Sequence, residues 1–398
     1  MEECRSLKIA IVIASLLMLW VAFALPAKSC AADAPPDRLR HAVDDAVRPM
    51  MAKEHIPGMA VGITTGGKSW IFNYGVASTE THKPVSDDTL FEVGSISKTF
   101  TATLTSWAQV EGRLSLSDKV ENFLPTLKST PFGSVTLLNL GTHTPGGLPL
   151  QMPNDIHNEE QLVQYFKAWR PTCAPGTCRT YSNVSVATLG LVTAKAMGQD
   201  FTVLMQQRLL PPLGMTSTFI EVPAARMPDY AEGYTQKDRP VRMSLGVLFA
   251  EAYGIKSTAP DMIRWLQANM NELKLDAKLQ RAIIDTHTGY FKAGVMTQDL
   301  MWEQYAYPVS LETLHEGNAA AMIFNATQAT AIKPPLAPQQ NVWINKTGST
   351  NGFGAYVAFV PEKQVGIVIL ANKSFPIEQR VTMAYQIVQA LGDGDMPR

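Results

Sequence analysis

The sequence predicts an α/β protein of the α+β type, in which an antiparallel sheet is built from both chain ends and flanked by helices. Strand-like segments lie at residues 58–78 near the start of the chain and at 342–373 near its end. Between them, residues 110–230 hold helical segments broken by Pro and Gly. Strands at both ends with helices between them predict one shared sheet and a mainly helical inserted region.

The first elements follow from apolar spacing. Segment 37–55 has a helical repeat of apolar residues: Leu39, Val43, Val47, Met50 and Met51. Segment 58–78 has the pattern of two strands around a Gly-Gly turn. A further helix is expected after residue 95, with one apolar stripe: Phe100, Leu104 and Trp107.

Helices are also expected in the middle of the chain, at 158–170, 184–198, 201–214 and 257–270. Residues 275–340 show no clear pattern. The C-terminal part has a predicted antiparallel meander followed by a closing helix: strands at 342–349, 353–361 and 365–373, helix at 378–392. The expected division is a signal peptide at 1–31, a discontinuous sheet-containing domain at 35–110 and 310–398, and a mainly helical insertion with mixed segments at 111–309.

The start of the chain has the composition of a secretory signal peptide. Arg5 and Lys8 precede the apolar run IAIVIASLLMLWVAFAL, and small-x-small cleavage sites follow at 22–24 and 29–31. A retained membrane anchor is the alternative, because residues 9–25 are nearly long enough to span a bilayer. We expect cleavage, export to the periplasm and no membrane contact after the signal is removed.

The composition excludes several classes of function. The chain has 398 residues and a formal net charge of −1, with no basic run, so nucleic acid is not an expected partner. The histidines are scattered, without H-x-H or H-E-x-x-H, so no metal site and no zinc hydrolase is predicted. No organic cofactor is expected either.

Cys173 and Cys178 are the cysteines that follow the leader. In an oxidising compartment they can form a small disulfide loop. Half of a metal site is the alternative, but the sequence has no second pair to complete it. We predict the disulfide and expect it to stiffen the loop that leads to Tyr181.

The first motif with chemical meaning is S-x-x-K at residues 95–98. Positions i and i+3 of a helix share a face, so Lys98 would lie beside the Ser95 hydroxyl. A lysine shielded from water loses affinity for its proton and can act as a base. The alternative is an N-cap serine followed by a solvated lysine, and S-x-x-K alone is too common to decide.

Two further motifs follow in order. Tyr181 and Asn183, two residues apart, point to the same side of extended backbone, so a proton relay and an amide hydrogen bond can act together. Lys346, Thr347 and the following glycine form K-T-G in a predicted strand, where a cation and hydroxyl can bind a carboxylate. The alternatives are an ordinary helix cap and a polar strand end.

In combination the three motifs match the penicillin-recognising signature, with Y-S-N in place of S-D-N. From about residue 35 to 391 the sequence resembles class C serine β-lactamases of the AmpC type. The resemblance rests on long matches: IPGMAVGI, LFEVGSISKTFT, LLNLGTHTPGGLPLQ, APGTCRTYSN, EAYGIKST, KTGSTNGFGAYVAFVPEK and GIVILANKSFP. It implies the serine β-lactamase/DD-peptidase fold.

The resemblance also implies a role for each matching residue. Ser95 would be the acylated nucleophile, Lys98 its partner and Tyr181 the general acid/base. Lys346 and Thr347 would form the active-site pair of the third motif. Gln151 and Asn183 match residues that bind the substrate amide, and Tyr253 matches an aromatic wall of the site. Ser349 lies where the second oxyanion-hole N–H is supplied, the first being that of Ser95. Arg380 matches an arginine near the substrate carboxylate.

The implied reaction is hydrolysis of the β-lactam amide through a Ser95 acyl-enzyme, conferring resistance to these antibiotics. Cephalosporins are the expected preference, a small-molecule β-lactam is the expected partner and the protein is expected to be a monomer. Whether Tyr181 or Lys98 is the base stays open. The chain departs from the usual pattern at four places: His143, Asn351 and the two cysteines.

Three other functions share this fold or site. A D-Ala-D-Ala peptidase or penicillin-binding protein would acylate but release penicillin slowly. A carboxylesterase would commonly lack K-T-G, which is intact here. A catalytically silent peptidoglycan-binding relative would have an unreactive Ser95.

Overall fold

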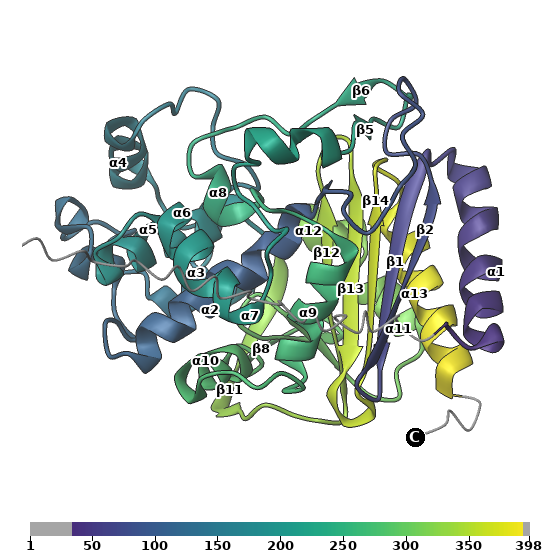
Figure 1. Ribbon diagram of the computed structural model, residues 1–398. Helices are drawn as coiled ribbons and strands as arrows, with labels where there is room; N and C mark the ends of the chain where they lie inside the picture. Colours follow the sequence, from purple (N-terminus) through teal and green to yellow (C-terminus); the bar gives the residue numbers. More distant parts are fainter. Residues whose placement is uncertain (1–33, 393–398) are drawn as a thin grey trace, which may run out of the picture. The chain divides into compact units, whose positions relative to one another are not determined.

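The computed structural model describes residues 34–392, and Figure 1 shows their arrangement. The expected signal peptide lies outside the described residues. The central feature is a 10-stranded sheet in the order β2-β1-β14-β13-β12-β10-β9-β8-β11-β4. Within the described chain, no helix combines the length and the apolar character needed to cross a membrane.

Both chain ends contribute to this sheet, as the sequence predicts. The N-terminal hairpin consists of β1 (Gly58–Thr65) and β2 (Lys68–Gly75). The C-terminal meander consists of β12 (Val342–Ser349), β13 (Gly354–Val360) and β14 (Val365–Ala371). Strand β1 pairs antiparallel with β14, with Met59 opposite Ala371, so the two chain ends meet one strand in from an edge of the sheet. The predicted fold class is confirmed.

The poorly patterned region also supplies strands. It contains α10 (Ala277–Asp285), β8 (Gly289–Ala293), β9 (Met296–Gln298), β10 (Glu303–Ala306), α11 (Leu311–Gly317), α12 (Ala320–Phe324) and β11 (Thr327–Leu336). Strands β8–β10 lie within the range expected to be mainly helical with mixed segments, yet they extend the central sheet. They are short, and only β8 alternates in burial, so the sequence shows no sustained period of two across these strands.

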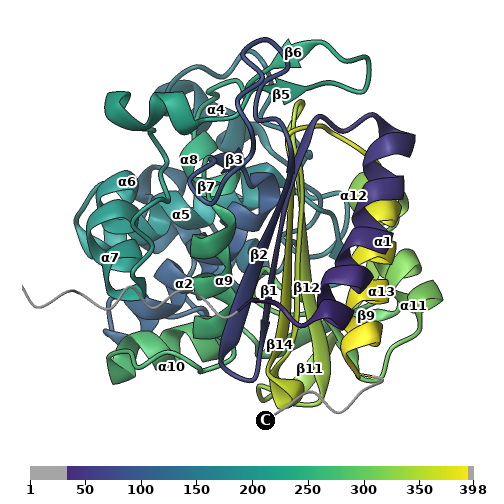
Figure 2. The same cartoon turned by 45° about the vertical axis from the view of Figure 1, so that its right-hand side comes forward.

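Helices cover the two faces of the sheet (Figure 2). On one face α1 (Asp37–Glu54) packs on α13 (Ile377–Gly392), and a core of buried apolar residues lies between them and the strands. On the other face α9 (Ala259–Asn269) packs on β1 and β14. Its amphipathic pattern begins at the N-cap Thr258, whose side chain accepts from the Asp261 N–H.

A separate apolar cluster lies within the helical region. Its helices include α2 (Ser97–Val110), α3 (Leu137–Gly141), α4 (Glu159–Ala168) and α5 (Asn183–Met197). Smaller elements complete the region: α6 (Phe201–Val203), α7 (Leu210–Leu213) and α8 (Phe249–Ala252), with β3 (Phe91–Glu92), β4 (Cys178–Arg179), β5 (Gly233–Tyr234), β6 (Pro240–Val241) and β7 (Lys256–Ser257). Helices α2 and α5 pack on each other, and the turn that leads into α2 packs on β12 and β13.

Candidate active site

A cavity of about 1190 Å³ lies between the helical region and the end of β12. Its lining includes most of the residues singled out in the sequence: Ser95, Gln151, Tyr181, Asn183, Tyr253, Thr347 and Ser349. Lys98, Lys346 and Arg380 lie buried behind this lining. The structure thus brings together segments that are far apart in the chain, as the motif order predicts.

Ser95 lies in a 3-10 turn (Gly94–Ile96) that leads directly into α2. One turn later, Lys98 is fully buried. Its Nζ donates to Ser95 Oγ at 2.8 Å and to the Ala252 carbonyl oxygen at 2.8 Å. The sequence predicts a single apolar stripe on this helix, but α2 is buried on nearly every side, and Lys98 is shielded from solvent.

Burial lowers the pKa of Lys98 to about 8, and the neighbouring Lys346 charge acts in the same direction, while Tyr181 opposes it. About a tenth of Lys98 is therefore neutral at pH 7, far more than for a lysine in water. The neutral amine can accept the proton of the Ser95 hydroxyl, whose oxygen is already within hydrogen-bond distance. This is the environment that an activated serine requires.

Tyr181 is placed by the start of α5. The next residue, Ser182, is the N-cap of that helix and accepts from the Ser185 N–H. The Tyr181 ring lies 5.3 Å from Lys98 Nζ and 5.0 Å from Lys346 Nζ. Burial alone would raise the pKa of Tyr181, but Lys346, Lys98 and a hydrogen bond with Ser95 outweigh it and hold the pKa below its usual value. The phenol can thus exchange a proton with Ser95.

Lys346 stays charged because of a buried carboxylate behind it. Its Nζ lies 3.3 Å from Glu303 Oε1, on the neighbouring strand β10. The same oxygen also accepts from Arg179 Nη2 at 3.3 Å. Burial alone would lower the pKa of Lys346, but the Glu303 and Tyr181 charges raise it above its usual value. Lys346 is therefore a fixed positive charge beside Tyr181.

Sequence reasoning missed Arg179 and Glu303. Arg179 stands two residues before Tyr181, so the alternation that links Tyr181 with Asn183 could have indicated it. Its guanidinium carbon lies 5.5 Å from the Tyr181 ring centroid. Glu303 had no such signal, because it lies on a four-residue strand within the region that lacks a clear pattern.

Two close backbone approaches form the candidate oxyanion hole. A Cβ at Gly94 would lie 2.6 Å from Ser349 N, and a Cβ at Gly348 would lie 2.0 Å from the Val93 carbonyl oxygen. Only glycine lets the nucleophile turn and the end of β12 come this close. The N–H groups of Ser95 and Ser349 are thereby brought to the same edge of the cavity, where they can stabilise a developing oxyanion.

Gly348→Ala should separate these two N–H groups, because the added Cβ would strike the Val93 carbonyl. We expect kcat/KM for a β-lactam to fall by about 10²–10³-fold, the usual effect of losing one oxyanion donor. Ser349→Ala is the matched control, since it keeps the backbone N–H and should retain most of the activity. Equal losses in the two variants would contradict a backbone role.

The polar residues of the cavity form a second group. Asn183 Nδ2 donates to Gln151 Oε1 at 2.8 Å, and Asn183 Oδ1 has no partner among the described residues. That buried oxygen therefore has an unused capacity to accept a hydrogen bond. Tyr253 follows α8 and presents a half-buried ring to the cavity. Thr347 reaches the cavity from β12, beside Lys346.

Arg380 lies behind the end of β12 and does not line the cavity. It is 1% exposed, and its Nη1 donates to the Gly348 carbonyl at 2.6 Å and to Ser349 Oγ at 2.8 Å. Nη2 donates to the Phe375 carbonyl. The guanidinium thus braces the end of β12 from behind through Nη1, while its Nε has no partner among the described residues.

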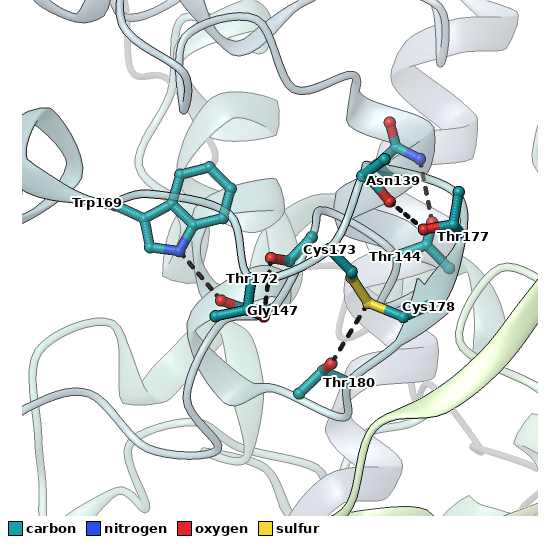
Figure 3. The surroundings of a disulfide bond; sticks show 11 residues. Asn139, Thr144, Gly147, Trp169, Thr172, Cys173, Thr177, Cys178 and Thr180 are labelled. Atoms are coloured by element: carbon teal, nitrogen blue, oxygen red, sulfur yellow. Dashed lines mark hydrogen bonds between the residues drawn. A yellow bond between two sulfur atoms is a disulfide. The ribbon is translucent and has the colours of Figure 1, made fainter.

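The two cysteines form a disulfide in the loop before Tyr181 (Figure 3). Their Cα atoms are 6.4 Å apart, within the range that a disulfide spans. Cys178 and Arg179 form β4, which pairs with β11 at the edge of the central sheet. The disulfide loop therefore links the sheet to the segment that carries Tyr181.

The mature, non-reduced protein should show no titratable thiol at Cys173 or Cys178. A peptide that contains both residues should be lighter by two hydrogens before reduction than after it, as mass spectrometry of a digest measures. Two reactive thiols in the unfolded, non-reduced protein would contradict the disulfide. Ellman titration with and without a reductant provides the independent check.

Residues 34–392 contain no group of three or more His, Cys, Asp or Glu side chains placed to hold a metal ion. The groups that meet at the site are a serine hydroxyl, a phenol and two lysine amines: Ser95, Tyr181, Lys98 and Lys346. This arrangement suits acyl transfer, in which a nucleophile, a proton acceptor and two oxyanion donors must converge.

Comparison with known proteins agrees with this geometry. The family model described as Beta-lactamase matches residues 43–392. A β-lactamase from Pseudomonas fluorescens is 47% identical over 353 residues, covering 89% of this chain and 99% of that protein.

Two solved structures are also similar. A D-alanine carboxypeptidase AmpC from Burkholderia cenocepacia is 57% identical, with a TM-score of 0.86 and coverage of 89% of this chain and 99% of that one. A class C β-lactamase in complex with cefoxitin is 53% identical, with a TM-score of 0.87 and coverage of 89% and 99%.

Proposed function

The chain belongs to the class C β-lactamase family and is a β-lactam hydrolase, and from this premise we propose that it works through an acyl-enzyme on Ser95. The observation that carries the proposal is the contact between Lys98 Nζ and Ser95 Oγ at 2.8 Å, inside a buried site. The lowered pKa values of Lys98 and Tyr181 support it, because both groups can take the serine proton.

In the first step, Ser95 Oγ attacks the β-lactam carbonyl as its proton passes to the Lys98–Tyr181 pair. The two groups are in contact, so they titrate together and the proton belongs to the pair. The negative carbonyl oxygen is stabilised by the N–H groups of Ser95 and Ser349. The C–N bond then breaks, and Tyr181 delivers the proton to the leaving nitrogen.

In the second step, water attacks the ester carbonyl from the Tyr181 side and gives up a proton to that residue. The ester C–O bond then breaks, and the Lys98–Tyr181 pair returns that proton to Ser95 Oγ, which frees the acid product. The fixed charge of Lys346 keeps the phenolate form of Tyr181 accessible. Asn183 Oδ1 and Gln151 bind the substrate amide, Tyr253 packs against its side chain, and Thr347 binds its carboxylate. Arg380 supports the carboxylate site from behind β12, through the hydrogen bond that its Nη1 donates to the Gly348 carbonyl oxygen.

The substrate is a small-molecule β-lactam, with cephalosporins preferred. The protein acts as a monomer in the periplasm, after removal of its signal peptide, and confers β-lactam resistance. The apolar leader followed by small residues supports export. The disulfide supports an oxidising compartment.

The test is hydrolysis of the chromogenic cephalosporin nitrocefin by the mature protein, with and without EDTA. We expect turnover that EDTA does not reduce. An acid-quenched sample should carry the acyl group on the peptide that contains Ser95, as mass spectrometry measures. An adduct on another residue would contradict the assignment of the nucleophile. Comparing kcat/KM for a cephalosporin and a penicillin tests the preference.

A second candidate activity is release of D-alanine from D-Ala-D-Ala peptides. It is favoured by the 57% identity to a D-alanine carboxypeptidase AmpC. Incubation with a D-Ala-D-Ala peptide, followed by measurement of free D-alanine, tests it. A fluorescent penicillin that stays bound for many minutes, instead of being hydrolysed, would make this the main activity.

A further inference from the structure

His143 holds the backbone on both sides of Tyr181. Its carbonyl oxygen accepts from the Thr180 N–H at 2.9 Å. Its ring nitrogen Nδ1 accepts from the Ser182 N–H at 3.2 Å. Between these two hydrogen bonds, the imidazole centroid lies 4.4 Å from that of the Tyr181 ring. One residue therefore contacts Tyr181 and both of its chain neighbours.

We propose that His143 is a positioning residue, which holds the Tyr181 hydroxyl between Ser95 and the two lysines through its ring acceptor Nδ1. The inference rests on the acid/base role proposed above for Tyr181. His143 does not line the substrate cavity, so it acts through Tyr181 and not on the substrate. His143 differs from an ordinary buried histidine because it bonds the backbone on both sides of Tyr181.

The acceptor role fixes the state of the ring. If Nδ1 accepts a hydrogen bond, the proton of the neutral imidazole must be on Nε2. Nε2 has no partner within residues 34–392. Protonation would place a donor at Nδ1 opposite the Ser182 N–H, and would remove one of the contacts that hold Tyr181.

The surroundings keep His143 neutral. Burial is the main cause of a pKa far below the usual value, and three cations act in the same direction: Arg179, Lys98 and Lys346. The remaining titratable group on its ring is the Tyr181 phenol. Nδ1 therefore stays an acceptor throughout the pH range in which Tyr181 and Lys98 exchange protons.

The backbone that follows His143 is held by the disulfide loop. The Gly176 N–H donates to the Thr144 carbonyl at 2.9 Å, and the Thr172 N–H donates to the Gly146 carbonyl at 2.8 Å. The Cys173–Cys178 disulfide joins the two sides of that loop (Figure 3). The imidazole thus belongs to a segment whose backbone is held by these two hydrogen bonds to the disulfide loop.

Two substitutions of His143 test the hydrogen-bond acceptor and the aromatic ring separately. His143 has a φ of 59°, in the left-handed region, where Asn is better tolerated than most residues. His143→Asn keeps an acceptor near the position of Nδ1 and suits this backbone. His143→Phe keeps the ring against Tyr181 but leaves the buried Ser182 N–H without its partner.

We expect His143→Phe to lower kcat for nitrocefin by roughly tenfold to a hundredfold, with KM nearly unchanged, because a small shift of Tyr181 disturbs the proton path. The acid limb of its pH–kcat/KM profile should move to higher pH, since Tyr181 moves away from the lysines. His143→Asn should stay within about threefold of the wild type, with the same acid limb. An unchanged kcat in His143→Phe, or equal losses in both variants, would overturn the proposal.

A measurement on the unaltered protein tests the same point even if His143→Phe does not fold. Nitrogen-15 NMR of histidine-labelled protein should show His143 with its proton on Nε2 from about pH 5 to pH 8. A proton on Nδ1, or a titration within that range, would overturn the proposal. Nitrocefin turnover by the unaltered protein is measured in parallel, so failure of the proposed function and failure of the His143 role give different results.

Discussion

Ser95→Ala should abolish β-lactam hydrolysis. The substitution removes the oxygen that becomes acylated, which lies 2.8 Å from Lys98 Nζ. Loss of a serine nucleophile lowers kcat by about 10⁴-fold or more, because the remaining groups act only through it. The Lys98 amine keeps its bond to the Ala252 carbonyl, so the buried site should remain assembled.

Ser97→Ala is the matched control within the same motif. The Ser97 hydroxyl oxygen accepts from the Ile255 N–H at 3.1 Å and lies outside the proton path. Its removal leaves that N–H unpaired, at a cost of about 1–3 kcal/mol in the free energy of unfolding. Steady-state kinetics should therefore show near-normal kcat with a lower melting temperature. Retention of more than about one hundredth of kcat in Ser95→Ala would contradict the nucleophile.

Lys346→Gln should move the acid limb of the pH–kcat/KM profile to higher pH. The Lys346 charge lowers the pKa values of both Tyr181 and Lys98, so its removal raises both. Glu303 raises both pKa values as well, and it is less neutralised once Lys346 is gone. The deprotonated pair that accepts the Ser95 proton then forms only at higher pH. At pH 7 we expect kcat/KM to fall by about 10²-fold.

Lys346→Arg is the control for this charge. The guanidinium keeps a cation beside Tyr181 and can still pair with Glu303, so its acid limb should stay near that of the unaltered protein. Measurement of kcat/KM from about pH 5 to pH 10 covers both limbs. If the acid limbs of Lys346→Gln and the unaltered protein coincide, the charge of Lys346 does not set the proton affinity of the site.

The sequence indicates those parts of the fold and site that depend on local pattern. The N-terminal hairpin and the C-terminal meander have clear strand spacing, and their pairing follows from their places at the two chain ends. The three motifs each lie at a helix start or on a strand. Their order along the chain indicated that Ser95, Tyr181 and Lys346 share one cavity. The disulfide was likewise predictable, because Cys173 and Cys178 are the two cysteines that follow the expected leader.

Other features depend on contacts between distant segments, which leave no local pattern. Glu303 acts only because β10 pairs with β12, and the short strands of residues 289–306 give no period to predict that pairing. The brace that Arg380 forms behind β12 depends on the packing of α13 against the sheet. The hydrogen bond from Ser182 to His143 depends on the fold of the 144–147 segment over the disulfide loop.

The pairing of β1 with β14 also has a consequence for how the chain reaches its native state. During synthesis β1 emerges early, whereas its partner is among the last segments to be made. Until then, one edge of the first hairpin has unpaired N–H and C=O groups, which can template association with another chain. Contacts of such long sequence separation also slow folding. A chain that chaperones keep extended until its last strand is available avoids this association. A fragment that ends before Val365 lacks β14, so the edge of β1 stays exposed to other chains.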